Sequence, residues 1–266
     1  MRSGWCQAEP KYDGRFSNAE SPYMATVHAV PRQRTYLDSF LILTAFWFLL
    51  LAIFHAWPTI DVRISQMFFS GPLCGDPYAG DQCGNFPLSK VSPIATLRWI
   101  LYAMPYVAAA IVLIALAVAG FSPRLRHRMP VHRLWMSLVS LGISTGLITN
   151  VLLKGHAGRP RPIQTDLFGG KLEFMPAGSF NGACERNCSF VSGEASGAGW
   201  LICLLFLLPP RYRSWIAPPV ILASVATAGL RVAVGAHYAS DATLGLLISI
   251  TVFVGMLALE EQAASR

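Results

Sequence analysis

The sequence predicts an all-α integral membrane protein with six transmembrane helices. Of its 266 residues, 53% are hydrophobic and only 13% are charged, whereas soluble domains carry about 25% charged residues. The hydrophobic residues gather in runs that approach or exceed the roughly 20 residues a helix needs to cross a bilayer. The net charge of +7 does not indicate nucleic-acid binding, because the basic residues lie in loops between the apolar runs.

Six apolar runs are the candidate spans, and the last three look short against the length of a full crossing. Each of these three adjoins a polar motif. If the helices continue into the motifs, their lengths suffice and the motif residues lie at the membrane surface. The fourth run is the shortest and the weakest candidate. The six runs are 36–57, 97–121, 134–153, 195–208, 215–230 and 243–259.

The other segments are assigned by composition. Residues 1–35 are mixed and polar, with no apolar run that suits a signal peptide, so we expect a poorly ordered tail. Residues 61–69 have apolar side chains at helical spacing, which indicates a short helix lying at the membrane interface. The membrane domain is therefore expected over 36–259, with a second short tail over 260–266.

Lysine and arginine in the short loops predict the orientation of the chain. The N-terminal tail, the loop 122–133 and the loop with Arg211 and Arg213 are basic and share one side. This side, with both termini, is predicted to be cytoplasmic. The loops on the outer side are about 58–92, 154–193 and 231–242. The loop 154–193 is also basic, which suggests that its charges serve another purpose.

Cysteine positions agree with this orientation. Four of the six cysteines, Cys74, Cys83, Cys184 and Cys188, fall in two of the outer loops, and disulfides persist on the oxidising side of a membrane. Proximity favours the pairs Cys74–Cys83 and Cys184–Cys188, although four cysteines allow three pairings. Zinc is the rival interpretation, but no histidine lies near either pair in sequence, so no metal site is predicted.

Three polar motifs in the second half of the chain resemble the type 2 phosphatidic acid phosphatase (PAP2) superfamily. The family pattern is K-x6-R-P, P-S-G-H and S-R-x5-H-x3-D. Leu230 replaces the serine of the third motif, and the second motif lacks both its proline and its histidine, with Glu194 in place of the histidine. The corresponding residues here are Lys154-x6-Arg161-Pro162, then Val191-Ser192-Gly193-Glu194, then Arg231-x5-His237-x3-Asp241.

The resemblance implies a lipid phosphate phosphatase that needs no cofactor and forms a phosphohistidine. His237 would be the nucleophile, and Asp241 would accept a hydrogen bond from one imidazole nitrogen and leave the other free to attack. Cations and helix N-terminal N–H groups would bind the phosphate, although Ser192 could also be a simple helix cap. The implied phosphate-binding residues are Lys154, Arg161, Ser192, Gly193 and Arg231.

Arg159 and Glu194 have roles that the motifs leave open. The spacing selects Arg161 for the phosphate, so Arg159 is expected to hold either a second phosphate or an acidic loop residue. Glu194 is predicted to be the general acid that protonates the leaving oxygen, which requires a setting that keeps the carboxyl protonated. The alternative is a carboxylate at a helix start that pairs with an arginine.

The predicted function is hydrolysis of a lipid phosphate monoester in a bacterial inner membrane, at an active site facing the periplasm. By resemblance, lipid A is favoured over phosphatidylglycerophosphate and phosphatidic acid. The alternatives are an undecaprenyl pyrophosphate phosphatase, a lipid-to-lipid phosphotransferase and a lipid-binding or transport protein with a degenerate site. The expected partners are the lipid substrate and the bilayer.

Overall fold

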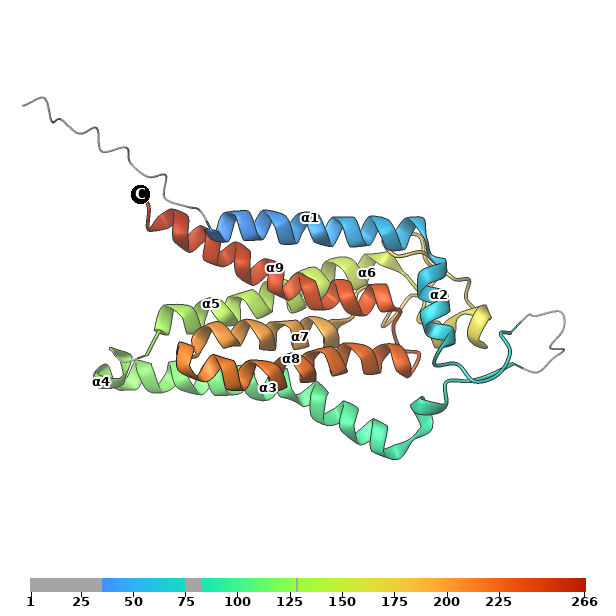
Figure 1. Ribbon diagram of the computed structural model, residues 1–266, viewed down its shortest axis with the longest axis horizontal. Helices are drawn as coiled ribbons and strands as arrows, with labels where there is room; N and C mark the ends of the chain where they lie inside the picture. The colour runs from blue at the N-terminus through green and yellow to red at the C-terminus, as the bar shows by residue number, and fades with distance from the viewer. Residues whose placement is uncertain (1–34, 75–82, 128) are drawn as a thin grey trace, which may run out of the picture. The chain divides into compact units, whose positions relative to one another are not determined.

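The computed structural model describes residues 35–74, 83–127 and 129–266, and every regular element within these ranges is a helix. The expectation of a disordered tail falls on residues outside these ranges. The long helices run side by side between two ends of a bundle (Figure 1). They are α1 (Thr35–Ala56), α3 (Ser92–Phe121), α5 (Val131–Leu141), α8 (Pro210–Ala233) and α9 (Ala239–Ala263).

The third long helix changes its winding before it reaches the first motif. α5 continues as a π-helix over Gly142–Leu153 and then as the short α6, Lys154–Ala157. Short elements fill the connections. They are α2 (Thr59–Gln66), α4 (Pro123–Arg126), α7 (Gly193–Cys203) and four 3₁₀ turns at Pro87–Lys90, Pro162–Gln164, Asp166–Phe168 and Leu204–Leu207.

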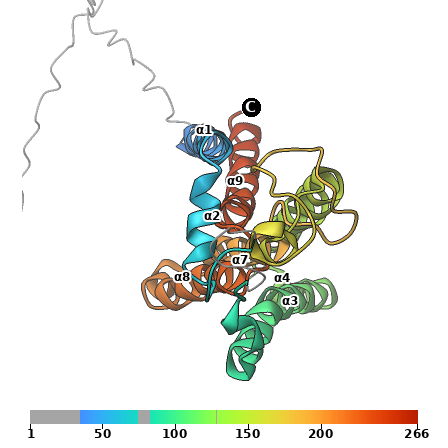
Figure 2. The same cartoon turned by 90° about the vertical axis from the view of Figure 1, so that its right-hand side faces the viewer.

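Five helices in the described ranges are long and apolar enough to cross a membrane, so the predicted count of six is not confirmed. The exception is α7, which with its 3₁₀ turn covers only Gly193–Leu207. At about 1.5 Å per residue this is too short for a hydrocarbon core about 30 Å thick. Most of α7 is buried, and α9, α8 and α3 surround it (Figure 2). Because protein rather than lipid encloses α7, its length need not match the bilayer.

The last two predicted spans do continue into their motifs. α8 extends from 210 to 233 and includes Arg231, while α9 begins at Ala239 and includes Asp241. α9 also runs to Ala263, so most of the expected C-terminal tail is helical. The backbone N–H of Tyr36 donates to Glu261 Oε2 at 3.2 Å. The start of α1 and the end of α9 therefore lie at the same end of the bundle.

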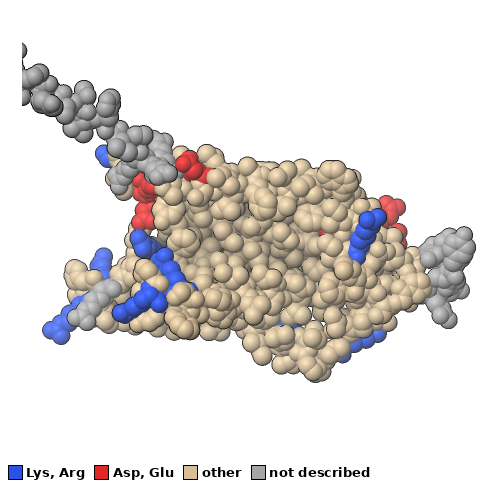
Figure 3. All heavy atoms as spheres, in the orientation of Figure 1, with Lys and Arg blue, Asp and Glu red and all other residues tan. Residues whose placement is uncertain are grey.

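The two ends of the bundle hold different elements. On the face drawn in Figure 3, Lys and Arg cluster at the end that holds α4, and others lie at the opposite end. The opposite end holds α2 and both disulfides, which are the predicted pairs Cys74–Cys83 and Cys184–Cys188. The remaining described cysteine, Cys203, is free and buried in α7.

Small residues let α7 and α9 approach closely. A Cβ atom built on Gly199 of α7 would lie only 2.2 Å from the backbone oxygen of Leu246 in α9. A Cβ atom on Gly245 would lie 2.5 Å from the backbone oxygen of Ser192. Glycine at such contacts is typical of helix packing in membranes, where backbones must approach for van der Waals contact.

We therefore expect Gly199→Ala to lower the free energy of unfolding by about 1–3 kcal/mol, the usual effect of overpacking. Thermal unfolding in detergent measures this change. The matched control is Gly229→Ala in α8, where an added Cβ meets no atom within 4 Å and alanine should be neutral or stabilising. Equal melting temperatures for the two variants would contradict the close contact.

Candidate active site

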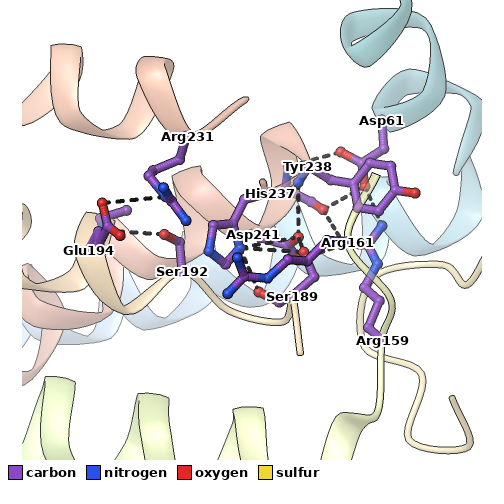
Figure 4. A network of polar contacts seen from close by, with 12 residues as sticks. Asp61, Arg159, Arg161, Ser189, Ser192, Glu194, Arg231, His237, Tyr238 and Asp241 are labelled. Atoms are coloured by element: carbon purple, nitrogen blue, oxygen red, sulfur yellow. Dashed lines mark hydrogen bonds and ion pairs between the residues drawn. The ribbon is translucent and has the colours of Figure 1, made fainter. Parts of the chain in front are cut away.

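The three sequence motifs meet at one cavity of about 580 Å³. Figure 4 shows Arg161 of the first motif, Glu194 of the second, and Arg231 and His237 of the third close together. They come from the segment after α6, the start of α7, the end of α8 and the turn before α9. The apolar part of the cavity lies beside Pro105 of α3 and Gly146 of the π-helix. Its polar wall is formed by Arg98, Lys154, Arg161, Asn187, Glu194, Arg231 and His237.

His237 lies in the turn between α8 and α9 and is almost fully buried. Its Nδ1 atom is 2.8 Å from the backbone oxygen of Ser189. Because a carbonyl can only accept, Nδ1 carries the proton and Nε2 keeps the lone pair. Nε2 has no hydrogen-bond partner among the described residues, and His237 lines the cavity. The imidazole is therefore fixed in the tautomer whose free lone pair, on Nε2, a nucleophile requires.

The hydrogen bond expected between His237 and Asp241 is not present. The nearest carboxylate oxygen, Oδ2 of Asp241, is 3.9 Å from Nδ1, beyond hydrogen-bond range. That oxygen instead accepts the Ser189 hydroxyl at 2.5 Å and the Tyr238 backbone N–H at 3.0 Å. Asp241 thus reaches the imidazole indirectly, through Ser189, and the sequence reasoning assigned the wrong direct partner.

The charge state of His237 follows from its surroundings. Burial, and then the positive charges of Arg231, Lys154 and Arg161, hold the pKa of His237 well below its ordinary value. Both effects disfavour the imidazolium form. At neutral pH the ring is therefore uncharged, and its free lone pair faces a cationic cavity.

The three predicted cations line the cavity from three different elements. Lys154 begins α6, Arg161 follows that helix and Arg231 lies in the last turn of α8. Arg161 donates from Nε to the backbone oxygen of Asn187 at 2.9 Å and from Nη2 to its side-chain oxygen at 2.5 Å. Two points of contact fix the plane of the guanidinium, and the Cys184–Cys188 loop supplies both acceptors.

Arg231 is only 4% exposed, yet its Nε has no hydrogen-bond partner. Its contact with an acidic group is the ion pair from Nε to Glu194 Oε2 at 3.4 Å. Buried polar groups are almost always hydrogen-bonded. A buried guanidinium with unused donors at the wall of a cavity is therefore well placed to bind an anion such as a phosphate.

The start of α7 supplies the second motif. Ser192 is its N-cap, and the hydroxyl accepts the N–H of Ala195 at 3.3 Å. The capping alternative raised from the sequence is therefore observed. Gly193 follows directly and lines the cavity. A Cβ atom there would lie 3.0 Å from the side-chain oxygen of Asn150, so the helix start is tightly fitted.

Glu194 is paired with arginines, as the alternative interpretation anticipated. Its Oε1 atom accepts Nη2 of Arg98 at 2.8 Å, and its Oε2 atom lies 3.4 Å from Nε of Arg231. Each carboxylate oxygen therefore lies beside a different guanidinium group. Oε2 accepts no hydrogen bond, so one oxygen of Glu194 is available for proton transfer. The general-acid role stays a prediction.

Arg159 does not face the cavity and cannot hold a second phosphate. It is fully buried, and it forms ion pairs with Asp241 at 2.6 Å and with Asp61 at 2.7 Å. Of the two expectations for Arg159, an acidic partner is confirmed. The partners, however, come from helices rather than from a loop, because α2 and α9 carry the two carboxylates.

The motifs alone did not identify four residues of this region: Asp61, Arg98, Asn187 and Ser189. Arg98 had a usable signal, because a lone charge near the start of an apolar span usually has a specific partner. Asp61 had none, since an acidic residue on an interfacial helix is ordinarily solvated. Among the described residues, no group of three or more His, Cys, Asp or Glu is arranged to hold a metal ion.

A neutral histidine that faces several cations in a bundle of apolar helices is chemically suited to bind and react with a phosphate group. Comparisons with known proteins agree. The PAP2 superfamily model matches residues 133–264. A lipid A 4'-phosphatase of Rhizobium etli is 44% identical and covers 87% of this chain and 91% of its own length. One from Rhizobium leguminosarum is 45% identical, covering 81% and 93%.

A solved structure supports the fold. The crystal structure of a transmembrane PAP2-type phosphatidylglycerolphosphate phosphatase from Bacillus subtilis matches with a TM-score of 0.51 at 19% identity. The match covers 85% of this chain and 97% of that one. This chain belongs to the PAP2 superfamily. It is a multi-pass membrane lipid phosphate phosphatase, as the three motifs predicted.

The position of the His237 proton can be tested by NMR on protein with isotope-labelled histidine, assigned with His237→Gln. We expect the neutral Nδ1–H tautomer at neutral pH. The ring should remain unprotonated as the pH falls through about 6.5, the ordinary histidine pKa, because the pKa is lowered. Protonation with a midpoint at or above that value would contradict the described surroundings.

Proposed function

We propose that this chain hydrolyses a phosphate monoester of lipid A, in the inner membrane of a bacterium and at the periplasmic face. The observation that carries the mechanism is the free Nε2 of a neutral His237 beside Lys154, Arg161 and Arg231. The names of the Rhizobium relatives support the substrate. Clustering of Lys and Arg at the opposite end of the bundle supports the orientation, with both termini in the cytoplasm.

In the first step, Nε2 of His237 attacks the phosphorus atom, and the bond from phosphorus to the lipid oxygen breaks. Lys154, Arg161, Arg231 and the N-terminal N–H groups of α7 neutralise the charge on the equatorial oxygens. The leaving lipid oxygen takes one proton. In the second step, water attacks the phosphohistidine and gives up a proton, the N–P bond breaks and inorganic phosphate leaves.

Glu194 is the proposed carrier of both protons. Its Oε2 accepts no hydrogen bond and borders the cavity. A phosphate dianion that binds Arg231 competes with Glu194 for the guanidinium, so substrate binding frees Oε2 from its ion pair with Arg231. Glu194 would then donate to the lipid oxygen and recover a proton from the attacking water. Arg98 holds the other carboxylate oxygen and fixes its direction.

The substrate is tested by phosphate release in detergent from lipid A, phosphatidylglycerophosphate, phosphatidic acid and undecaprenyl pyrophosphate. We expect free phosphate from lipid A in preference to the others. His237→Ala should lose activity by at least about 10⁴-fold, because loss of a covalent nucleophile removes the whole pathway. Activity that survives this substitution would exclude the phosphohistidine. Transfer of phosphate to a second lipid without phosphate release would instead indicate a phosphotransferase.

Glu194→Gln tests the proton carrier while it preserves the size of the side chain. We expect kcat to fall by about 10²–10⁴-fold, the usual range for a general acid or base. If Glu194 donates a proton, the unmodified protein should lose activity as the pH rises, and this loss should be absent in Glu194→Gln. A pH–rate profile with unchanged shape in Glu194→Gln would eliminate this role and leave Glu194 as a structural partner of Arg98 and Arg231.

A further inference from the structure

A second group of charges lies behind the active site rather than in it. Asp61, Arg159 and Asp241 are each fully buried and are joined by ion pairs. None of them lines the cavity. Asp61 belongs to α2, and Arg159 follows α6. Figure 4 shows Asp61 and Arg159 on the side of Asp241 away from Glu194.

Arg159 is held by an almost complete set of partners. Its Nη1 donates to Asp241 Oδ1 at 2.6 Å and to the Ser240 hydroxyl at 2.8 Å. Its Nη2 donates to Asp61 Oδ2 at 2.7 Å, and its Nε donates to the backbone oxygen of Met175 at 2.8 Å. The guanidinium lies 4.3 Å from the centre of the Tyr238 ring. A guanidinium group with this many contacts is held in one orientation.

Asp61 contacts both Arg159 and the start of α9. Its Oδ1 accepts the Ser240 backbone N–H at 2.9 Å, and its Oδ2 accepts the Ser240 hydroxyl at 2.5 Å. Asp61 therefore fixes both Arg159 and the first turn of α9, which carries Asp241. An aspartate of α2 thus determines where the carboxylate of α9 lies.

The group is connected to His237 through Ser189. The backbone N–H of Ser189 donates to the backbone oxygen of Arg159 at 2.7 Å. Its hydroxyl donates to Asp241 Oδ2 at 2.5 Å, and its backbone oxygen accepts Nδ1–H of His237 at 2.8 Å. Arg159 therefore positions Ser189 in two ways. The backbone of Arg159 bonds to the backbone of Ser189, and the guanidinium of Arg159 holds Asp241, which accepts the Ser189 hydroxyl. Ser189 in turn selects the tautomer of the nucleophile.

The charges of the group do not cancel. Both carboxylates use their oxygens as acceptors, from Arg159, from backbone N–H groups and from serine hydroxyls. Two carboxylates and one guanidinium leave a net charge of −1. Without Asp61, Arg159 and Asp241 would form a neutral pair. Asp61 is thus the residue that leaves negative charge behind the imidazole.

Stability alone gives little reason to retain such a group. Removing three charges from solvent is unfavourable, and buried ion pairs can often be replaced by apolar side chains without loss of stability. A net negative charge has a use here, however. As Nε2 bonds to phosphorus, positive charge develops on the imidazole ring, on the side that faces Ser189 and Asp241. A fixed negative charge there stabilises the transition state more than the ground state.

We infer that Asp61 and Arg159 are positioning residues for His237: they orient Asp241 and Ser189, and they leave one negative charge that balances the imidazolium formed during phosphoryl transfer. This inference rests on the proposed function, because it takes His237 as the nucleophile. It concerns the rate of the chemical step and not the binding of the lipid, since neither residue reaches the cavity.

Asp61→Asn tests the inference in the full-length protein, with lipid A as substrate and phosphate release as the readout. We expect kcat to fall by about 10–100-fold, as for other residues that orient a reactive group, with KM unchanged. The first comparison, Ser240→Ala, removes the bridging hydroxyl but no charge, so its kcat should fall by less than that of Asp61→Asn. The second, Asp166→Asn, neutralises an exposed aspartate elsewhere in the chain and should have no effect.

A double variant tests whether Asp61 and Arg159 act as one unit or contribute to kcat independently. If Asp61 and Arg159 act together, Asp61→Asn combined with Arg159→Lys should lose no more activity than Arg159→Lys alone. Losses that multiply would overturn the joint role. Melting temperatures are measured for all variants, so that kcat values are compared at equal stability. If Ser240→Ala then loses as much kcat as Asp61→Asn, the loss does not come from the charge of Asp61, and the charge argument is overturned.

The remaining outcomes are equally decisive. A folded Asp61→Asn protein with unchanged kcat overturns the inference. If Asp61→Asn does not fold, Arg159→Lys alone is judged by the same criterion, and failure of both to fold assigns the pair to folding instead. His237→Ala keeps the two proposals apart. An active His237→Ala protein refutes the proposed mechanism, whereas an inactive one beside a fully active Asp61→Asn protein refutes the positioning role only.

Discussion

The close approach of α7 to α9 is the constraint on which the site depends. The backbone N–H of Ser192 donates to the backbone oxygen of Asp241 at 3.0 Å, so the starts of the two helices are joined directly. Gly245 makes this possible, because any side chain there would meet the backbone of Ser192. The bond places the second motif against the third. The small residues at the contact between α7 and α9 are thus a requirement of the site as well as of the packing.

Around this contact, the chain separates two kinds of charge. Two cations that border the cavity, Arg98 and Arg231, each have a buried Nε without a hydrogen-bond partner, and such a donor is costly until an anion binds. Arg159, by contrast, is saturated by protein acceptors and is closed to ligand. Two arginines that are two positions apart in sequence, Arg159 and Arg161, therefore have opposite roles. One is part of the scaffold and the other faces the cavity.

Much of this could be predicted from the sequence, and the failures have physical reasons. Spacing identified the residues of the three motifs, because each motif is one short continuous segment at the ends of helices. Hydropathy predicted a transmembrane span over 195–208, and the short α7 does not confirm it. An apolar run is equally suited to lipid and to the interior of a bundle. Asp61 and Arg98 were missed because their partners are about 100 residues away. The link between His237 and Asp241 was simplified, since a backbone carbonyl, which has no sequence signature, takes the place of the carboxylate.

The short Cys184–Cys188 loop has a consequence for the maturation of the protein. Between these cysteines, Asn187 adopts a left-handed backbone conformation with φ of 52° and presents both oxygens that orient Arg161. The disulfide keeps that five-residue ring closed. The residue that orients Arg161 is therefore held by a bond that forms by oxidation after synthesis. Disulfides form and persist in oxidising compartments, so we expect the orientation of Arg161 to be completed only after the chain has reached such a compartment.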